Sequence, residues 1–339
     1  MSSAPATIDS ATPAQLVQLL CVKLRASYIY PPVADQVCDR LQQHLDDGDY
    51  EGITEGEFLA YALTHHMQEV SDDEHLWVRW HPEPLPDQEG QLRHSEEWLA
   101  QQRLDADLDN YGLREGKRLP GNVGYLEIHT LHRPEWGGET AMAAMNYLAN
   151  TSALIFDLRG CTGGYPGMVA FILSYLFGDE PLHLSSIYWR DDDVTQKYWT
   201  LPHVPGKRLA DEPVYVLTGP DTFSGGEEFA YDLQALGRAT LVGESTGGGA
   251  HPGASYRLHP HFEAFIPIGR AINPVTGANW EGTGVIPDIA VPAELALDTA
   301  YRLALEAVIA GIGQPASGPL EALRLEAQVA LAGLGNGRV

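Results

Sequence analysis

Cysteine is scarce in this chain. Only three cysteines occur among the 339 residues, Cys21, Cys38 and Cys161, and no two of them form a CxxC pair. An odd number with this spacing predicts neither a disulfide framework nor a zinc site. The composition, with 44% hydrophobic and 20% charged residues, is that of a globular protein large enough for one large domain or two ordinary ones.

Positive charge is also scarce. The chain has 21 Lys and Arg residues against 46 Asp and Glu residues, which gives a formal net charge of −25. Because nucleic acids and anionic membranes bind basic surfaces, we expect neither as a partner. The first residues lack the basic and apolar regions of a signal peptide, and no apolar run approaches the length of a membrane span. We therefore expect a cytoplasmic protein.

Motifs for common cofactors are missing as well. The glycine-rich run DLRGCTGGYPGM at 157–168 has neither the Lys-Ser/Thr of a P-loop nor the G-x-G-x-x-G of a dinucleotide site. No H-E-x-x-H or similar metal-binding spacing occurs. The sequence thus predicts no cofactor and no metal ion.

Hydrophobic periodicity predicts an α/β protein with a helical N-terminal region. Residues 13–69 carry apolar side chains at helical spacing in about three segments. From residue 121 onward, short β-rich apolar runs alternate with helical patterns, which is typical of a mostly parallel sheet. We expect a helical subdomain at 1–80, a linker or mobile excursion at 81–119, an α/β domain at 120–312 and a C-terminal tail helix at 313–339.

Ser224 lies where a predicted strand ends and a helix begins, in DTFSGGEEFAYDLQ. With Glu227 it forms an S-x-x-E capping box, and most serines in this position are helix caps. The alternative is that Ser224 is a nucleophile displayed at a strand-to-helix turn. The G-x-S-x-G motif of α/β-hydrolases does not fit, because residue 222 is threonine.

Two glycine-rich turns would flank Ser224 in such a sheet. One contains Gly163 and Gly164 and the other is GESTGGGAHPG at 243–253. Because sites in open α/β sheets form at the carboxyl ends of the strands, we expect Gly163, Gly164, Ser224 and Gly225 to converge. Their backbone N–H groups would then stabilise an oxyanion next to the serine.

A serine nucleophile also needs a base. The four lysines all precede Ser224, which excludes a dyad with a lysine after the nucleophile. The base is then a histidine or a carboxylate. His75, in EVSDDEHLWVRW, has acidic neighbours that we expect to raise its basicity, although it is also readable as a surface histidine. His251 is the second candidate, and Glu281 is a candidate for orienting a histidine.

These motifs, taken in order, resemble a known family. They are SDDEHL at 71–76, DLRGCTGG at 157–164, SGGEEFAY at 224–231, VGESTGGGAHP at 242–252 and NWEGTGVIPD at 279–288. The chain resembles the tail-specific (C-terminal processing) serine proteases, in the bacterial branch similar to interphotoreceptor retinoid-binding protein. The resemblance covers about residues 13–310 and implies a crotonase/ClpP-like β-β-α domain without an evident PDZ domain.

The resemblance implies a role for each candidate residue. Ser224 matches the nucleophile, Gly225 and the turn of Gly163 and Gly164 match the oxyanion donors, and His75 and Glu281 look like the base and orienting acid of tricorn-like members. His251 and Thr162 are expected to contact substrate. The chain departs from the family at Ser245, where lysine-dependent members have their base, and at Glu74, where tricorn-like members have a serine.

Three functions remain open from the sequence. The first is a serine peptidase acting through an acyl-enzyme on a peptide or small apolar substrate. The second is a non-catalytic module that binds an apolar, retinoid-like ligand. The third is a biosynthetic enzyme that uses the same oxyanion turns for other chemistry. The sequence predicts no oligomeric state.

Overall fold

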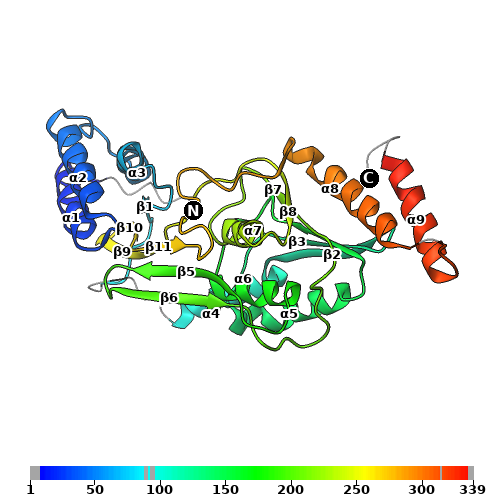
Figure 1. Cartoon of the computed structure of the whole chain (residues 1–339). Helices are drawn as coiled ribbons and strands as arrows, with labels where there is room; N and C mark the ends of the chain where they lie inside the picture. Colours follow the sequence, from blue (N-terminus) through cyan, green and yellow to red (C-terminus); the bar gives the residue numbers. More distant parts are fainter. Residues whose placement is uncertain (1–7, 88–90, 92–95, 314, 335–339) are drawn as a thin grey trace. The chain divides into compact units, whose positions relative to one another are not determined.

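The structure is a computed structural model that describes residues 8–87, 91, 96–313 and 315–334 (Figure 1). The remaining residues, which include parts of the predicted segments 1–80, 81–119 and 313–339, lie outside this description. The chain divides into two units. The first consists of Met1–Ser95, Ile187–Gln196 and Gly249–Ile272, and the second of Glu96–Ser186, Lys197–Gly248 and Asn273–Val339.

The first unit combines three helices with a small antiparallel sheet. The helices are α1 (Thr12–Ser27), α2 (Pro31–Asp46) and α3 (Gly56–Ser71). The strands β1 (Trp77–Trp80), β10 (Phe262–Pro267) and β9 (Gly253–His259) pair in that order. A single apolar cluster joins the helices to the sheet and includes the fully buried Leu20, Leu63 and Phe262. The helices therefore bury their apolar stripes against each other and against the sheet.

Helix α2 illustrates how the sequence specifies these helices. Pro31 occupies its first turn, where the missing N–H costs nothing. Its buried residues Ala34, Val37, Cys38 and Leu41 follow the three-to-four residue spacing of one helical face.

The second unit is built on a six-stranded sheet in the order β12-β8-β7-β4-β3-β2. The bounds are β2 (Leu113–Leu119), β3 (Val123–Ile128), β4 (Ala153–Asp157), β7 (Val214–Thr218), β8 (Thr240–Gly243) and β12 (Ile289–Ala290). Only the edge strand β2 runs antiparallel to its neighbour. Every residue of β4 and β7 is buried, as expected for central strands with both faces covered.

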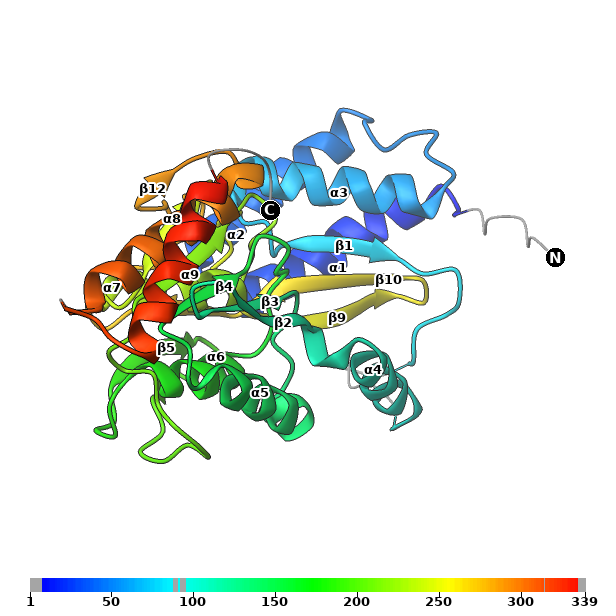
Figure 2. The same ribbon diagram turned by 90° about the vertical axis from the view of Figure 1, so that its right-hand side faces the viewer.

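Helices cover both faces of this sheet. On one face, α8 (Ala293–Gly311) packs on the central strands and α9 (Pro319–Leu334) packs beside α8 (Figure 2). Ile155 in β4 belongs to the apolar cluster that α8 covers. Its neighbour Phe156 contacts Phe229 on the opposite face, as the alternation of side chains along a strand requires. The opposite face carries α5 (Pro134–Leu148), α6 (Pro166–Leu173) and α7 (Gly225–Ala235).

The remaining elements lie outside the two sheets described above. Helix α4 (Glu96–Leu108), η1 (Asn110–Gly112) and β2 occupy much of the predicted linker 81–119. The other elements are η2 (Ser174–Leu176), β5 (His183–Trp189), β6 (Val194–Trp199) and β11 (Gly269–Ile272), and a third sheet has the order β11-β5-β6. The predicted α/β class with a helical N-terminal region is confirmed, and the described residues form no further unit that would correspond to a PDZ domain. The crotonase/ClpP-like form of the sheet stays a prediction.

Parallel strands bring three turns of the second unit to one edge of the sheet. Strand β4 leads into the turn 158–165, β7 into 219–224 and β8 into 244–248. Because these strands are parallel neighbours, the turns leave the sheet at the same edge.

Candidate active site

Ser224 adopts a strained backbone conformation between β7 and α7. Its φ is 49° and its ψ is −116°, values that residues with a side chain rarely adopt. A conformation of this kind costs on the order of 1–3 kcal/mol and persists only where the surrounding structure enforces it. A strained serine at a strand-to-helix turn is the backbone feature by which α/β-hydrolases display their nucleophile.

Neighbouring contacts enforce this conformation. The capping box predicted from the S-x-x-E spacing is formed, and the Ser224 N–H donates to Glu227 Oε2 at 2.8 Å. The preceding Phe223 N–H donates to the Cys161 carbonyl at 2.9 Å. Thr222, where a hydrolase elbow would have glycine, is fully buried and donates its hydroxyl to the Leu158 carbonyl at 2.7 Å. Cap and strained turn thus coexist at one residue.

The structure brings Gly163, Gly164, Ser224 and Gly225 together. A β-carbon added to Gly163 would lie 2.8 Å from the Ser224 β-carbon, and one added to Gly225 would lie 2.9 Å from the Gly164 nitrogen. Gly163 and Gly164 have φ values of 116° and 140°, which favour glycine. Side chains at these positions would separate the two turns.

The N–H groups of Gly164 and Gly225 donate to no acceptor within the part of the chain that the structure describes. The flanking groups are engaged, because Leu131 N–H donates to Gly163 and Tyr165 N–H donates to Leu131. Two unengaged N–H groups beside a serine hydroxyl are the arrangement that an oxyanion hole requires. Thr162 is exposed next to this turn, and its N–H donates to the His129 carbonyl at 3.0 Å.

Glu281 lies in a loop that is fastened to the turn after β8. Its carboxylate is half-buried, and its own N–H donates to Asn279 Oδ1 at 3.1 Å. The Gly282 N–H donates to the Gly248 carbonyl at 2.9 Å, and the Val285 N–H donates to Thr246 Oγ1 at 2.7 Å. The loop of Glu281 and the turn after β8 therefore belong to one hydrogen-bonded unit.

The first unit holds His75 and His251 around a buried carboxylate. Asp73 Oδ1 accepts the His75 N–H at 3.0 Å, and Asp73 Oδ2 accepts the Tyr28 hydroxyl at 3.0 Å. His251 Nδ1 lies 2.9 Å from the same Oδ2, and the Tyr30 ring packs edge-on against the His251 ring. His251 and Asp73 are both buried. Sequence reasoning did not single out Asp73 or Tyr28, because the contacts of Asp73 with Tyr28 and His251 join residues 45 and 178 positions apart.

The titration of His75 differs from the sequence expectation. Burial lowers the pKa of His75 to about 4, even though the carboxylate of Asp73 acts in the opposite direction. The expected rise in basicity was wrong because desolvation of the imidazolium outweighs the neighbouring charge. His75 is consequently neutral at pH 7 and able to accept a proton.

Helix α7 also buries two carboxyl groups that the sequence analysis did not single out. Glu228 and Asp232 are one turn apart and lie on one face of the helix. Burial raises the pKa of Glu228 to about 7, against a hydrogen bond from Ser185. Burial and then the charge of Glu228 raise the pKa of Asp232, whose Oδ1 accepts from Asn273 at 2.9 Å.

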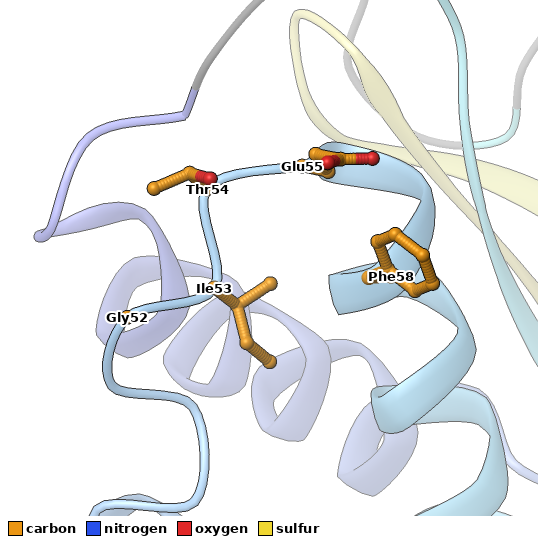
Figure 3. Close-up of a pocket in the computed structure, with 5 residues that line it drawn as sticks. All are labelled: Gly52, Ile53, Thr54, Glu55 and Phe58. Carbon is orange, nitrogen blue, oxygen red and sulfur yellow. The ribbon is translucent and has the colours of Figure 1, made fainter.

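A shallow pocket in the first unit lies elsewhere. It is lined by Gly52, Ile53, Thr54, Glu55 and Phe58 at the start of α3 (Figure 3). Glu55 is the one titratable residue in that lining, so the pocket lacks the paired groups that acid–base or nucleophilic chemistry requires.

Two family models match the chain. The model of peptidase family S41 matches residues 122–291, which include both glycine turns, Ser224 and Glu281. The chain belongs to peptidase family S41. A second model, the N-terminal domain of S41 peptidases in eukaryotic IRBP, matches residues 7–108, which include His75. The predicted family is thereby confirmed, and membership supports a serine-type peptidase with peptides as its substrate class.

Solved structures with a similar fold cover nearly the whole of this S41 chain. A lipoprotein from Streptococcus agalactiae is 14% identical with a TM-score of 0.53, over 90% of this chain and 99% of that chain. A proposed peptidase from Parabacteroides merdae is 18% identical with a TM-score of 0.60, over the same shares. At identities of 14% and 18%, these two matches show a common fold and nothing further.

The position of the lysine in lysine-dependent relatives is occupied by Ser245, which is exposed after β8. This serine cannot accept the nucleophile's proton at neutral pH, so in this S41 chain another residue has to act as the base. No helix among the described residues is long and apolar enough to cross a membrane.

Proposed function

We propose that this S41 peptidase cleaves peptide bonds through an acyl-enzyme in which Ser224 is the nucleophile. One observation carries the proposal: Ser224 is held at φ 49° beside the unengaged N–H groups of Gly164 and Gly225. A capping serine needs no strained backbone, whereas a displayed nucleophile does. A serine that only caps a helix also does not require a glycine turn, such as that of Gly163 and Gly164, packed against it.

In the proposed mechanism, His75 accepts the proton of the Ser224 hydroxyl as the oxygen attacks the substrate carbonyl. The resulting oxyanion accepts hydrogen bonds from Gly164 and Gly225, each donor being worth about 10²–10³ in rate in comparable sites. The His75 imidazolium then protonates the leaving amine, which leaves an ester on Ser224. Water, deprotonated by His75, hydrolyses the ester and restores the serine. Glu281 has the role of orienting the His75 imidazole.

The protonation state of His75 is compatible with this role. A base must be neutral at the working pH, and burial lowers the pKa of His75 to about 4. We assign substrate contact to Thr162, whose exposure next to the Gly163 turn suits that role. The predicted substrate contact of His251 has no support from its burial, because its ring is buried against Asp73. A cytoplasmic location stays a prediction from the sequence.

A second function has one observation in its favour. The match to the N-terminal domain of eukaryotic IRBP favours a module that binds an apolar ligand without turning it over. Such a module has no need for a strained serine next to free donors. The third possibility, a biosynthetic use of the same oxyanion turns, has no separate observation in its favour.

Hydrolysis of a quenched fluorescent peptide library tests the proposal. Ser224→Ala is expected to reduce kcat/KM by about 10⁴-fold or more, because no other group replaces the nucleophile. Ser245→Ala is the matched control and is expected to keep the wild-type rate. Equal hydrolysis by Ser224→Ala and wild type would overturn the assignment. Absence of hydrolysis in the wild type, combined with tight binding of a fluorescent apolar ligand, would favour the second function.

A further inference from the structure

Glu227 is a fully buried carboxylate next to the proposed nucleophile. Its exposed fraction is 0%, and both of its oxygens accept hydrogen bonds. Oε2 accepts the Ser224 N–H at 2.8 Å. Oε1 accepts the Thr246 hydroxyl at 2.5 Å and the Gly248 N–H at 2.7 Å. The last two donors lie 19 and 21 residues further along the chain.

The direction of each hydrogen bond is fixed by the donors. The backbone N–H groups of Ser224 and Gly248 can only donate. Thr246 Oγ1 accepts the Val285 N–H at 2.7 Å, so its own hydrogen is available for Glu227. Glu227 therefore accepts hydrogen bonds from the Ser224 N–H, the Thr246 hydroxyl and the Gly248 N–H. Its place in the first turn of α7 suits a negative charge.

A helix cap alone does not account for these contacts. The capping box uses only Oε2, and it would be complete without Thr246 or Gly248. Through Oε1 the carboxylate reaches the turn after β8, and from there Thr246 and Gly248 hold the Val285 and Gly282 N–H groups. One side chain thus connects the nucleophile turn with both flanks of the loop that carries Glu281.

We propose that Glu227 is a positioning residue that fixes the Ser224 turn and the loop of Glu281 in their working geometry. This inference rests on the proposed function of Ser224. Glu227 has no access to substrate, so it acts through the backbone of Ser224 and through Thr246. Its loss is expected to slow the chemical step while leaving substrate affinity nearly unchanged.

Two variants that preserve size test the connection. Glu227→Gln keeps the shape but turns an N–H₂ group toward donors, so at least one of the three donors loses its acceptor. We expect kcat to fall about 100-fold, in line with a small displacement of reacting groups, and KM to change less than about threefold. Glu244→Gln, an exposed carboxylate on the same turn whose Oε2 accepts the Ala293 N–H, is the matched control and should leave both constants unchanged.

Thr246 supplies a second and gentler test. Thr246→Val removes the hydroxyl without changing the shape of the side chain, and we expect kcat to fall about tenfold through the loss of one buried hydrogen-bond pair. Thr246→Ser keeps the hydroxyl and should restore kcat to within about threefold of wild type. If Glu227→Gln does not fold, the contrast between valine and serine at residue 246 decides the question alone.

Amide hydrogen exchange separates this inference from the proposed function. In folded Glu227→Gln, exchange at the Ser224 and Gly248 amides should accelerate at least tenfold relative to Glu244→Gln, whether or not the protein hydrolyses peptides. Unchanged exchange together with wild-type kcat in Glu227→Gln and Thr246→Val would overturn the inference while leaving Ser224 as the nucleophile. If Ser224→Ala hydrolyses peptides at the wild-type rate, the proposed function is wrong. The amide-exchange comparison then still tests whether Glu227 positions the two turns.

Discussion

The β-carbon of Ser224 lies so close to Gly163 that a β-carbon on that glycine would approach it to 2.8 Å. The Gly163 φ of 116° is also unfavourable for any other residue. Space and backbone conformation therefore both require glycine at this position. The two turns approach each other only because neither carries a side chain between them.

Gly163→Ala is accordingly expected to damage both folding and activity. Backbone strain should lower the free energy of unfolding by about 1–3 kcal/mol. Displacement of Ser224 should reduce kcat/KM for a peptide substrate by about 100-fold. Gly138→Ala in α5 is the control, since a β-carbon there meets nothing within 4 Å and its φ is not positive. Equal activity of the two variants would contradict the close approach of the turns.

The low pKa of His75 predicts an unusual pH dependence. Desolvation lowers this pKa to about 4, so at equilibrium the imidazole is mostly neutral above pH 5 and becomes half-protonated near pH 4. If His75 is the base, kcat/KM should stay level from pH 8 down to about 5 and decline with a midpoint near 4. An acid limb centred near the ordinary histidine value of about 6.5 would argue against His75. Loss of activity in His75→Gln, measured at pH 7, is the companion result.

Because the pKa of Glu228 is raised, we expect the stability of the protein to fall as the pH rises. Its carboxyl group is hydrogen-bonded to Ser185, and Asp232, one helical turn away, accepts a hydrogen bond from Asn273. The charge of Glu228 contributes to raising the pKa of both Asp232 and Tyr198. Burial raises the pKa of Glu228 from 4.5 to about 7. Below pH 4.5 the Glu228 carboxyl group is protonated in both the folded and the unfolded chain. Between pH 4.5 and about 7 it is protonated only in the folded chain, so the free energy of unfolding decreases with each unit of pH in this range.

The measurement is urea unfolding of wild type and Glu228→Gln across this range. The glutamine variant removes the titration, so its advantage over wild type should grow from pH 4.5 to 7 and reach about 3 kcal/mol, at about 1.36 kcal/mol for each unit of pKa shift. A constant difference between the two proteins at all pH values would show that Glu228 titrates normally.

Asp73 is expected to be important for the stability of the first unit. It is buried and accepts hydrogen bonds from the Tyr28 hydroxyl and the His75 N–H, with His251 Nδ1 at 2.9 Å. Asp73→Ala should lower the free energy of unfolding by about 3–5 kcal/mol, because removing one member of a buried pair leaves its partners unsatisfied. Tyr28→Phe should cost about 1 kcal/mol.

Asp35→Ala is the surface control for this prediction. Asp35 forms an exposed ion pair with Arg25 at 2.9 Å, and exposed pairs contribute about 0–1 kcal/mol. In chemical denaturation, the loss in free energy of unfolding should therefore be largest for Asp73→Ala, smaller for Tyr28→Phe and smallest for Asp35→Ala. Similar losses for Asp73→Ala and Asp35→Ala would mean that the buried carboxylate adds nothing beyond a surface charge.

Local sequence patterns were sufficient to predict the helices, the alternation of strands and helices, and the cap at Ser224. Each of these depends on residues close together in the chain, such as the three-residue spacing of Ser224 and Glu227. The convergence of Gly163, Gly164 and Gly225 followed from one further rule, that parallel neighbouring strands end at the same edge of a sheet.

Contacts between distant residues were beyond that reasoning. The Oε1 contacts of Glu227 join residues 19 and 21 positions apart, and Asp73 meets a residue 178 positions away because β9 and β10 pair with β1. The pKa of His75 was misjudged for the same reason, since its acidic neighbours are visible in the sequence and its burial is not. The burial of a side chain depends on the whole fold, whereas its neighbours along the chain can be read directly from the amino-acid sequence.

The central claim is that Ser224 is a reactive nucleophile. Labelling with a fluorophosphonate probe, followed by peptide mapping, tests it most directly because the probe bonds covalently to activated serines. We predict one adduct, on the peptide containing Ser224, that is absent from Ser224→Ala and retained in Ser245→Ala. Equal labelling of wild type and Ser224→Ala, or an adduct on another serine, would contradict the account.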